Sequence, residues 1–381
     1  MNNATTKGKK PVVVYGASGY TGRLVCEYLR EYGIPFIAAG RSKDKLDAAM
    51  KANVPGIETA DFEVEEVAHT TEALTALFRG ASVVINTVGP FAKFGPEVVQ
   101  ACLNTGCHYT DTTGEQDWLI TLDEEYGPRF AAKGLLLSPG LAQMYTTGEI
   151  AAQLALETPG LDTLDIAVFW GGSPTIASTQ TILVNAATSK AFYLDQNQYK
   201  EWQPDAGLYQ LAIPGQHEVA LALPWGGTSH PVWFKRDPRV ATVKVLGGVF
   251  NKPLMLGVPK IVEAALEATK DMNAEDRYNA LAQTAAGVMN VMPPRENPRI
   301  NKSVDSVHAS GPLGRAHCVI FGNCNYKQTG LLNAFAASWL LQQPPKRVGF
   351  ASGCQAFGHH ELLGALRSFG LVQPPILTVQ H

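Results

Sequence analysis

A glycine-rich turn between an apolar run and a helix-like segment restricts the fold of this chain more than any other feature. Val12–Tyr15 is a short apolar run fit for a buried strand, and GASGYTG (Gly16–Gly22) follows it directly. After the turn, Leu24, Val25 and Tyr28 recur at helical spacing. A strand, a glycine turn and a helix in this order are typical of a parallel α/β sheet in which the turn holds a phosphate group.

Strand-like and helix-like segments continue to alternate up to residue 145. Several of the helix-like segments are closed by a glycine, as at Gly33, Gly80 and Gly106. The strands expected after the first are Pro35–Ala39, Ile57–Asp61, Ser82–Val88, His108–Thr112 and Leu135–Ser138. This alternation predicts a doubly wound, parallel Rossmann sheet with helices on both faces.

The middle of the chain has a different pattern, in which strand-like runs follow one another with one helix-like segment among them. These runs are Thr163–Phe169, Val219–Leu223, Pro231–Lys235 and Ala241–Leu246. Further along, Ser303–Ala309 and Ala316–Phe321 flank a turn and predict a hairpin. The pattern predicts a second, α+β domain with a mixed or antiparallel sheet over residues 146–328.

Charge and composition exclude several classes of function. The 381 residues carry a net charge of −3 and no basic run longer than Lys7–Lys10, so we expect no nucleic-acid partner. No apolar stretch approaches the ~18 residues of a membrane-spanning helix, and the N-terminal tail lacks the apolar core of a signal peptide. The six cysteines show no Cys-x-x-Cys spacing, so we expect reduced thiols and no metal site in a cytoplasmic protein.

Each glycine of the turn has a separate task in phosphate binding. Gly16 allows a sharp turn out of the strand, Gly19 lets the backbone approach a pyrophosphate, and Gly22 lets the helix pack closely on the strand. The helix N-terminus then presents backbone N–H groups and the positive end of its dipole to the anion. Further side chains and amides come from Ser18, Tyr20 and Thr21. The turn therefore predicts a dinucleotide cofactor.

The end of the second strand is expected to choose between NAD and NADP. NAD sites usually place a carboxylate there for the ribose hydroxyls, but Gly40-Arg41-Ser42 offers none. Arg41, Ser42 and Lys45 instead supply cationic and hydroxyl groups suited to a 2′-phosphate. The sequence therefore predicts NADP(H).

Further cofactor contacts are expected where other strands reach the same edge of the sheet, because ligands of open α/β sheets bind beyond the carboxyl ends of the strands. The residues assigned to this edge are Asp61 and Phe62 along the adenine, Thr87, Val88, Gly89 and Pro90 at the fourth strand, and Thr113, which would position the nicotinamide, after the fifth.

Taken together, these stretches resemble the saccharopine dehydrogenase superfamily, most closely its saccharopine dehydrogenase-like oxidoreductases and trans-acting enoyl reductases. The resemblance rests on GASGYTG, AAGRSKDKL, VVINTVGPFAKFGPEVVQACLNTGCHYTDTTGE and FAAKGLLLSPGL, and more loosely on WGGSPTIAS, GNCNYKQTGLLNAFAASWLL and VGFASGCQAFGHHELLGALRSFG. It implies NADP, often a homodimer, and a discontinuous cofactor domain of residues 1–145 and 329–381, with residues 146–328 between them as a domain for the substrate and for dimerisation. Relatives commonly carry an aspartate at the position of Ala142, so the role of that carboxylate does not transfer.

Glu115 and Tyr145 are the candidate catalytic proton donors, because both follow strands at the functional edge of the sheet. No Tyr-x-x-x-Lys pair occurs, so we do not expect the short-chain dehydrogenase mechanism. The structural alternatives are a capping carboxylate for Glu115 and a packing residue at a helix start for Tyr145. His230 is interpreted as a surface-loop residue, and His359-His360 as the start of a helix.

The region between Ala151 and Phe234 favours an apolar or aromatic substrate. It contains no arginine, although arginine forks normally bind substrates that carry several carboxylates, such as saccharopine. It also holds four of the six tryptophans: Trp170, Trp202, Trp225 and Trp233. The sequence thus predicts an NADPH-dependent reductase of a C=C, C=N or C=O bond in a mostly apolar small molecule. Two alternatives stay open: a saccharopine-type amino-acid dehydrogenase, and a non-catalytic NADP-binding sensor or scaffold.

Overall fold

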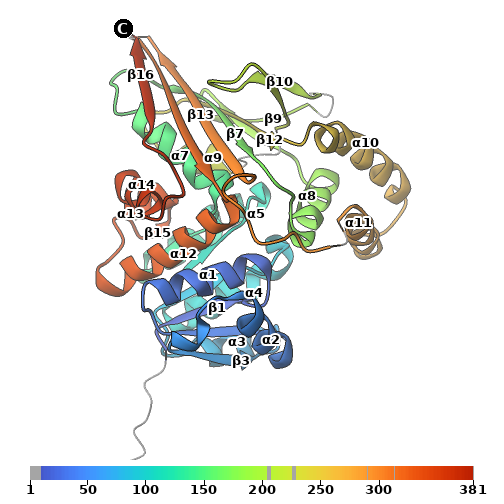
Figure 1. The fold of residues 1–381 in the computed structure, drawn as a ribbon, viewed down its shortest axis with the longest axis vertical. Helices are drawn as coiled ribbons and strands as arrows, with labels where there is room; N and C mark the ends of the chain where they lie inside the picture. The colour runs from blue at the N-terminus through green and yellow to red at the C-terminus, as the bar shows by residue number, and fades with distance from the viewer. Residues whose placement is uncertain (1–9, 204–206, 225–228, 290, 313, 381) are drawn as a thin grey trace, which may run out of the picture.

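The apolar strands of the N-terminal half pair in parallel and form a sheet that is buried on both faces (Figure 1). The computed structural model describes residues 10–203, 207–224, 229–289, 291–312 and 314–380. The strands are β1 (Val12–Tyr15), β2 (Phe36–Gly40), β3 (Phe62–Glu66), β4 (Val83–Asn86), β5 (His108–Asp111), β6 (Leu136–Ser138) and β15 (Gly349–Phe350). Their order, β15-β6-β5-β4-β1-β2-β3, confirms the predicted doubly wound Rossmann sheet.

Alternate side chains of the central strand β1 enter two different hydrophobic cores. Val12 and Val14 belong to one core, whereas Val13 and Tyr15 belong to the other, as the two-residue period of a strand requires. Among the helices that contribute to the first core are α1 (Tyr20–Glu31), α2 (Lys43–Asn53) and α12 (Asn325–Gln342), and among those of the second are α3 (Thr71–Phe78), α4 (Phe91–Thr105), α5 (Gln116–Thr121) and α6 (Gly127–Ala131).

A second seven-stranded sheet is mixed rather than parallel, as predicted for the second part of the chain. Its central strand, β7 (Thr163–Trp170), runs parallel to β12 (Thr242–Val249) and antiparallel to β13 (Lys302–Gly311). The predicted hairpin is confirmed, because β13 pairs with β14 (Gly314–Asn323) along its whole length. The other strands are β8 (Phe192–Asp195), β9 (Gln198–Glu201) and β16 (Ile376–Gln380).

Helix α7 (Gln143–Ala155) lies between the two sheets. It begins just after β6 and packs against β13, β14 and β7 of the second sheet. Its other side contacts α12 and α14 (His359–Ser368), with the short helix α13 (Gly353–Phe357) beside them. Nearly all of α7 is therefore buried, including Glu149 and Gln153.

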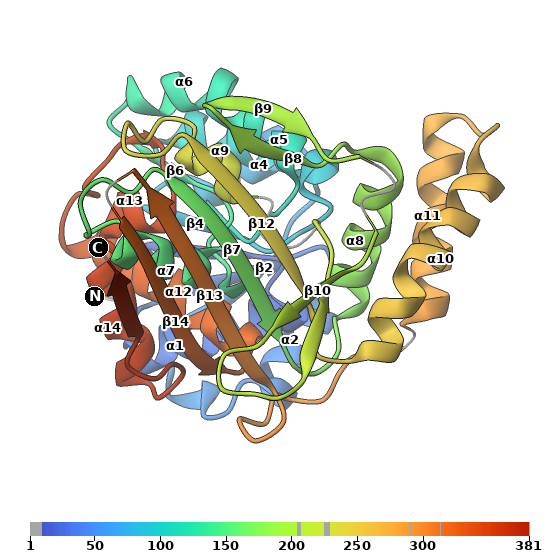
Figure 2. The same cartoon turned by 90° about the horizontal axis from the view of Figure 1, so that it is seen from above.

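A helical layer stands beside the second sheet and consists of α8 (Ile176–Thr188), α10 (Lys252–Thr269) and α11 (Ala274–Val288). Figure 2 shows α10 and α11 on the outer side of α8, and α11 packs on α8 through a small core that contains Leu183 and Leu281. A separate hairpin, β10 (Tyr209–Ala212) and β11 (Val219–Ala222), completes this part. Within the described residues, every helix is too short or too polar to cross a bilayer.

Two of the expected strands are wrong. Pro231–Lys235 falls largely on helix α9 (Ser229–Phe234), because a short apolar run fully buried on all sides carries no period that separates helix from strand. Ile57–Asp61 begins with a 3₁₀ turn, Ile57–Thr59, and the strand starts only at Phe62. This edge strand is half-buried from Phe62 to Val64 and exposed at Glu65 and Glu66, and it contains no continuous apolar run.

The C-terminal segment contributes to both sheets. Strand β15 pairs with β6 of the first sheet, and β16 pairs with β14 of the second. The division into a cofactor domain of residues 1–145 and 329–381 and a second domain of residues 146–328 therefore remains a proposal. By this division β16 belongs to the cofactor domain, although it pairs with a strand of the second sheet.

Candidate functional site

The glycine turn has the shape that a dinucleotide phosphate needs. Gly16 has a φ of +90°, and a β-carbon there would lie 2.7 Å from the Thr87 hydroxyl. A β-carbon at Gly22 would lie 2.4 Å from the Gly16 carbonyl oxygen, so the helix approaches the turn more closely than any other residue would allow. Gly19 is the N-cap of α1, with no capping side chain and no acidic residue in the first turn. The N-terminus of α1 is thus suited to an anion.

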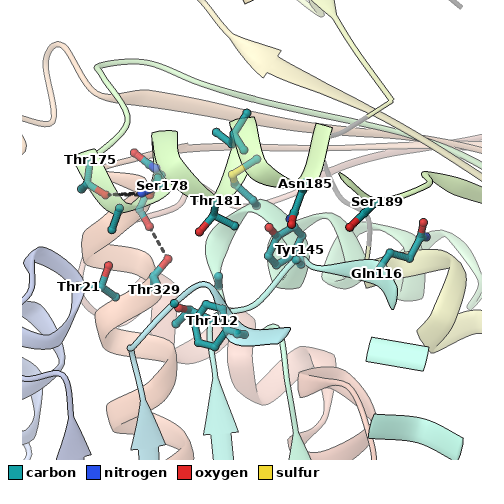
Figure 3. Close-up of a pocket in the computed structure, with 18 of the residues that line it drawn as sticks. Thr21, Thr112, Gln116, Tyr145, Thr175, Ser178, Thr181, Asn185, Ser189 and Thr329 are labelled. Atoms are coloured by element: carbon teal, nitrogen blue, oxygen red, sulfur yellow. Dashed lines mark hydrogen bonds between the residues drawn. The ribbon is translucent and has the colours of Figure 1, made fainter. Parts of the chain in front are cut away.

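A cavity of about 500 Å³ opens in front of this turn, between the two halves of the chain (Figure 3). Its floor comes from the turn and from the loops after β4, β5 and β6, and helix α8 forms the opposite wall. The predicted site residues that line it are Gly19, Tyr20, Thr21, Gly22, Thr87, Gly89 and Tyr145.

Tyr145 projects into the cavity from the first turn of α7, opposite α8 (Figure 3). A β-carbon placed at Gly114 would lie 1.8 Å from its hydroxyl oxygen, so the phenol occupies the space left by that glycine. Burial, together with the nearby carboxyls of Glu115 and Asp111, raises the pKa of Tyr145 well above its usual range. The phenol therefore carries its proton throughout the physiological pH range.

Glu115 caps a helix in this structure. One carboxylate oxygen accepts the N–H of Phe91 at 2.6 Å, and the other accepts the N–H of Ala92 at 2.7 Å. The side chain is buried, and this burial raises the pKa of Glu115 to about 7 although the two N–H groups oppose the shift. Glu115 thus holds α4 in place, the capping alternative considered for it, and its catalytic role stays a prediction.

Asp111 ties together two loops of the cavity floor. Its carboxylate accepts the N–H groups of Thr113 at 2.9 Å and Gly140 at 2.8 Å, and the Tyr109 hydroxyl at 2.8 Å. Thr113 itself is fully buried, and its hydroxyl accepts the N–H of Glu115. The cavity is lined instead by its neighbours Thr112 and Gly114, so contact of Thr113 with the nicotinamide is only a prediction.

The end of β2 carries the exposed side chain of Arg41. Ser42 is the N-cap of α2 and accepts the N–H of Lys45, whose side chain is exposed. Sequence reasoning missed Glu66 at the end of β3, whose carboxylate accepts the N–H of Lys43 at 2.8 Å. A negative group therefore lies beside the residues predicted to bind the 2′-phosphate.

Asp61 and Phe62 lie at the wrong edge of the sheet for the cofactor contact predicted for them. They precede or open β3, whereas ligands bind beyond the carboxyl ends of the strands. The carboxylate of Asp61 pairs with Lys10, and Phe62 stacks on Phe36 at a centroid distance of 5.7 Å. The displaced strand boundary produced this error.

The remaining predicted residues that the structure describes do not line the cavity. Val88 packs against Gly16, and Pro90 is the buried N-cap of α4. Ser18 lies within the turn and is half-buried. His230 is buried in α9 next to Trp233, not in a surface loop, and Trp225 falls outside the described residues.

A row of polar side chains on α8 and its two capping residues forms the cavity wall that sequence reasoning missed. Successive members are three or four positions apart, which places them on one face of the helix. They are Thr175, Ser178, Thr181, Asn185 and Ser189 (Figure 3). This spacing of polar residues is the sequence signal that could have indicated a polar helical face.

Hydrogen bonds connect this wall to the rest of the molecule. The Tyr326 hydroxyl on α12 accepts the N–H of Thr175 at 3.0 Å and lies 3.0 Å from the Ser178 hydroxyl. The Tyr326 ring contacts Tyr20 of the glycine turn at a centroid distance of 5.1 Å. The turn, α12 and α8 thus form one continuous contact.

The fold and site define a class of protein. The N-terminal part matches the model of the saccharopine dehydrogenase NADP binding domain over residues 12–132. The turn and the α1 N-terminus fit that cofactor, so this part of the chain is an NADP(H)-binding domain. A family of unknown function, DUF5938, matches residues 146–381, which is more than half of the chain. The chain belongs to this family.

Several curated proteins resemble the N-terminal part. A saccharopine dehydrogenase-like oxidoreductase of Homo sapiens is 31% identical over 148 residues, covering 35% of this chain and 34% of that protein. A trans-acting enoyl reductase, so named, of Mycobacterium tuberculosis is 36% identical over 125 residues, covering 32% and 30%. A lipid droplet localized protein of Caenorhabditis elegans is 35% identical over 131 residues, covering 32% and 31%. The chain spans about a third of the length of these relatives.

Proposed function

We propose that this protein is an NADPH-dependent reductase that transfers hydride to a C=C, C=N or C=O bond of an uncharged, mostly apolar small molecule. One observation carries the proposal: the glycine turn and the phenol of Tyr145 line the same cavity. Cofactor and proton donor would therefore meet one substrate. The names of the relatives, which include an oxidoreductase and an enoyl reductase, agree with this reaction class.

The chain's own residues divide the chemistry between them. Bound NADPH supplies the hydride from its nicotinamide ring. Gly16, Gly19 and Gly22 would hold the pyrophosphate, and Arg41 the 2′-phosphate. As the reduced bond gains electron density, Tyr145 would donate its phenolic proton to the oxygen, nitrogen or carbon that becomes negative. The loop ends fixed by Asp111 keep that phenol at the cavity floor.

The lining of the cavity supports an uncharged substrate. Among the described lining residues, Lys190 and Glu201 alone carry charge, and their side chains pair at 2.8 Å. Trp170, Trp202 and Met144 supply apolar surface, while the hydroxyls of α8 can bond to a carbonyl or hydroxyl of the substrate. This wall gives little support to a saccharopine-type substrate, since its described residues include no arginine for carboxylates.

Tyr145→Phe tests the proposal because it removes the proton and keeps the ring. Purified enzyme would be screened with NADPH against enones, cyclic imines and apolar ketones. For the best substrate we expect turnover in Tyr145→Phe to fall by about 10²-fold or more, with the NADPH dissociation constant unchanged. Equal turnover in wild type and variant would contradict the assigned donor, and Glu115→Gln measured in parallel would then test the other candidate.

A panel that binds but is never reduced would favour the non-catalytic sensor instead. Mass spectrometry of small molecules that co-purify with the protein would supply further candidates for the screen. Cytoplasmic location and a homodimer remain predictions from the sequence.

A further inference from the structure

Three side chains outside the cavity converge on one point at the C-terminal end of α7. His359 Nε2 lies 2.8 Å from Glu157 Oε1, and His360 Nε2 lies 2.6 Å from the same oxygen. The two imidazole rings lie 4.3 Å apart at an angle of 35°. Residues separated by about 200 positions in the chain thus present two nitrogens and a carboxylate to one small volume.

The local backbone explains how neighbouring histidines can face the same group. Adjacent residues within a helix point about 100° apart, but His359 and His360 are the first two residues of α14. The preceding Gly358 has a φ of +96° and supplies no capping side chain. Glu361, the next carboxylate along the helix, pairs with Lys346, so Glu157 is the carboxylate that meets the two rings.

The ligand atoms are close enough for a shared divalent ion. Those of Glu157, His359 and His360 all lie within 4.8 Å of one another. Around a tetrahedral Zn²⁺, with bonds of ~2.0–2.1 Å, neighbouring ligand atoms are about 3.3–3.4 Å apart. Small rotations of these side chains reach that separation, because 62% of the His360 side chain and 47% of the Glu157 side chain are exposed. The exposure also leaves a fourth position open to water.

We propose that Glu157, His359 and His360 form a binding site for a divalent ion that prefers imidazole, of which Zn²⁺ is the representative. Two nitrogens and one carboxylate suit Zn²⁺ better than Mg²⁺ or Ca²⁺, which take oxygen ligands. None of the three residues lines the cavity, so the site is structural rather than catalytic. It joins the end of α7 to the start of α14, and it does not rest on the proposed reductase activity.

Isothermal titration of the full chain with Zn²⁺, after treatment with a chelator, tests this site. We expect one Zn²⁺ per chain and a rise in melting temperature at saturating Zn²⁺, but no response to Mg²⁺. The double variant His359→Gln/His360→Gln should bind Zn²⁺ at least about tenfold more weakly. Co²⁺ used in place of Zn²⁺ should give the visible absorption of a nitrogen- and oxygen-ligated ion in wild type and lose it in the double variant.

A matched control removes a histidine from a different pair of neighbouring rings, which lies on β13 and β14. His308 and His317 lie 3.9 Å apart, and His308→Gln should leave Zn²⁺ binding unchanged. NADPH affinity, measured for every variant, shows that each one is folded. If the double variant does not fold, Glu157→Gln, which keeps a hydrogen-bond acceptor, gives the same comparison. Equal Zn²⁺ affinity in wild type and ligand variants, or no binding by wild type at about 1 mM Zn²⁺, would overturn the proposal.

Discussion

The hydroxyl oxygen of Tyr145 lies 1.8 Å from the point at which a β-carbon would stand at Gly114. The two residues come from different elements, since Gly114 follows β5 and Tyr145 belongs to the first turn of α7. Because no larger residue fits at position 114 while the phenol stays in place, this glycine determines where the proposed donor can stand.

Gly114→Ala should therefore displace the Tyr145 phenol. We expect turnover to fall at least as far as in Tyr145→Phe, because a displaced donor cannot deliver its proton and also obstructs the cavity. Steady-state kinetics with circular dichroism as a check on folding would measure this. Gly287→Ala is the matched control: it lies in α11 with nothing within 4 Å of the added carbon, so activity should not change. Full activity in Gly114→Ala would show that Tyr145 is not the proton donor of the reaction.

Arg41→Ala should change the preference between cofactors. The charge-assisted bond that Arg41 would make to the 2′-phosphate is worth ~1.5–3 kcal/mol, so NADPH should bind about tenfold to a hundredfold more weakly. NADH has no such phosphate, and its affinity should stay nearly constant. Fluorescence titration with both cofactors distinguishes the cases. An equal loss for NADPH and NADH would mean that Arg41 supports the fold or the adenine instead.

Glu66→Gln should act in the opposite direction. The Glu66 carboxylate accepts the Lys43 N–H at 2.8 Å, where its charge would repel a 2′-phosphate held by Arg41. Glutamine keeps the acceptor and removes the charge. We expect tighter NADPH binding at low ionic strength, with a smaller gain as salt is added. Weaker NADPH binding in this variant would show that Glu66 instead contacts the cofactor or orients Arg41.

The stability of the fold should decrease as pH rises toward 8. Burial raises the pKa of Asp305 to about 8, while in the unfolded chain it titrates near 4. The folded protein therefore binds more protons between these values, and the resulting stability is complete below pH 4 and lost as pH rises through 8. Asp305→Asn should flatten this dependence. At pH 8 its free energy of unfolding should exceed that of wild type by more than about 1.4 kcal/mol, which corresponds to one pKa unit. Denaturant titrations at several pH values measure this dependence. If the unfolding free energies of wild type and Asp305→Asn fall in parallel as pH rises, Asp305 is not responsible.

The six cysteines should react only after unfolding. All six are buried, and burial raises the pKa of thiols such as Cys26, Cys102 and Cys354. Native protein should therefore show little rapid reaction with a disulfide reagent such as DTNB, and denatured protein should react at all its cysteines. Rapid labelling of a native thiol would point to an opening of the core.

The first sheet could be predicted because its units are local. Each consists of a strand, a glycine-marked turn and a helix within a few tens of residues, so the glycine turn and Tyr145 were found without any long-range information. The third strand was misplaced because Phe62 and Val64 alternate with glutamates at a sheet edge, a pattern that a search for continuous apolar runs passes over. Asp61 and Phe62 were assigned to the wrong edge as a result.

The cavity wall could not be assigned in the same way. The spacing from Thr175 to Ser189 shows a polar helical face, but nothing local indicates what that face opposes. Its position depends on contacts between distant segments, such as the hydrogen bond between Thr175 and Tyr326. The same holds for Glu157, which meets His359 only when α7 and α14 are packed together.

The two strands near the C-terminus have a consequence for biosynthesis. Strand β15 completes the edge of the first sheet and β16 completes the edge of the second, yet each is made only after the strand with which it pairs, since β15 follows β6 and β16 follows β14 in the chain. During translation, which proceeds at about 5–20 residues per second, β6 and β14 are sheet edges without a neighbouring strand until β15 and β16 have been made. Neither sheet is complete before its last strand is made, and in that interval the nascent chain is exposed to edge-to-edge aggregation at β6 and β14.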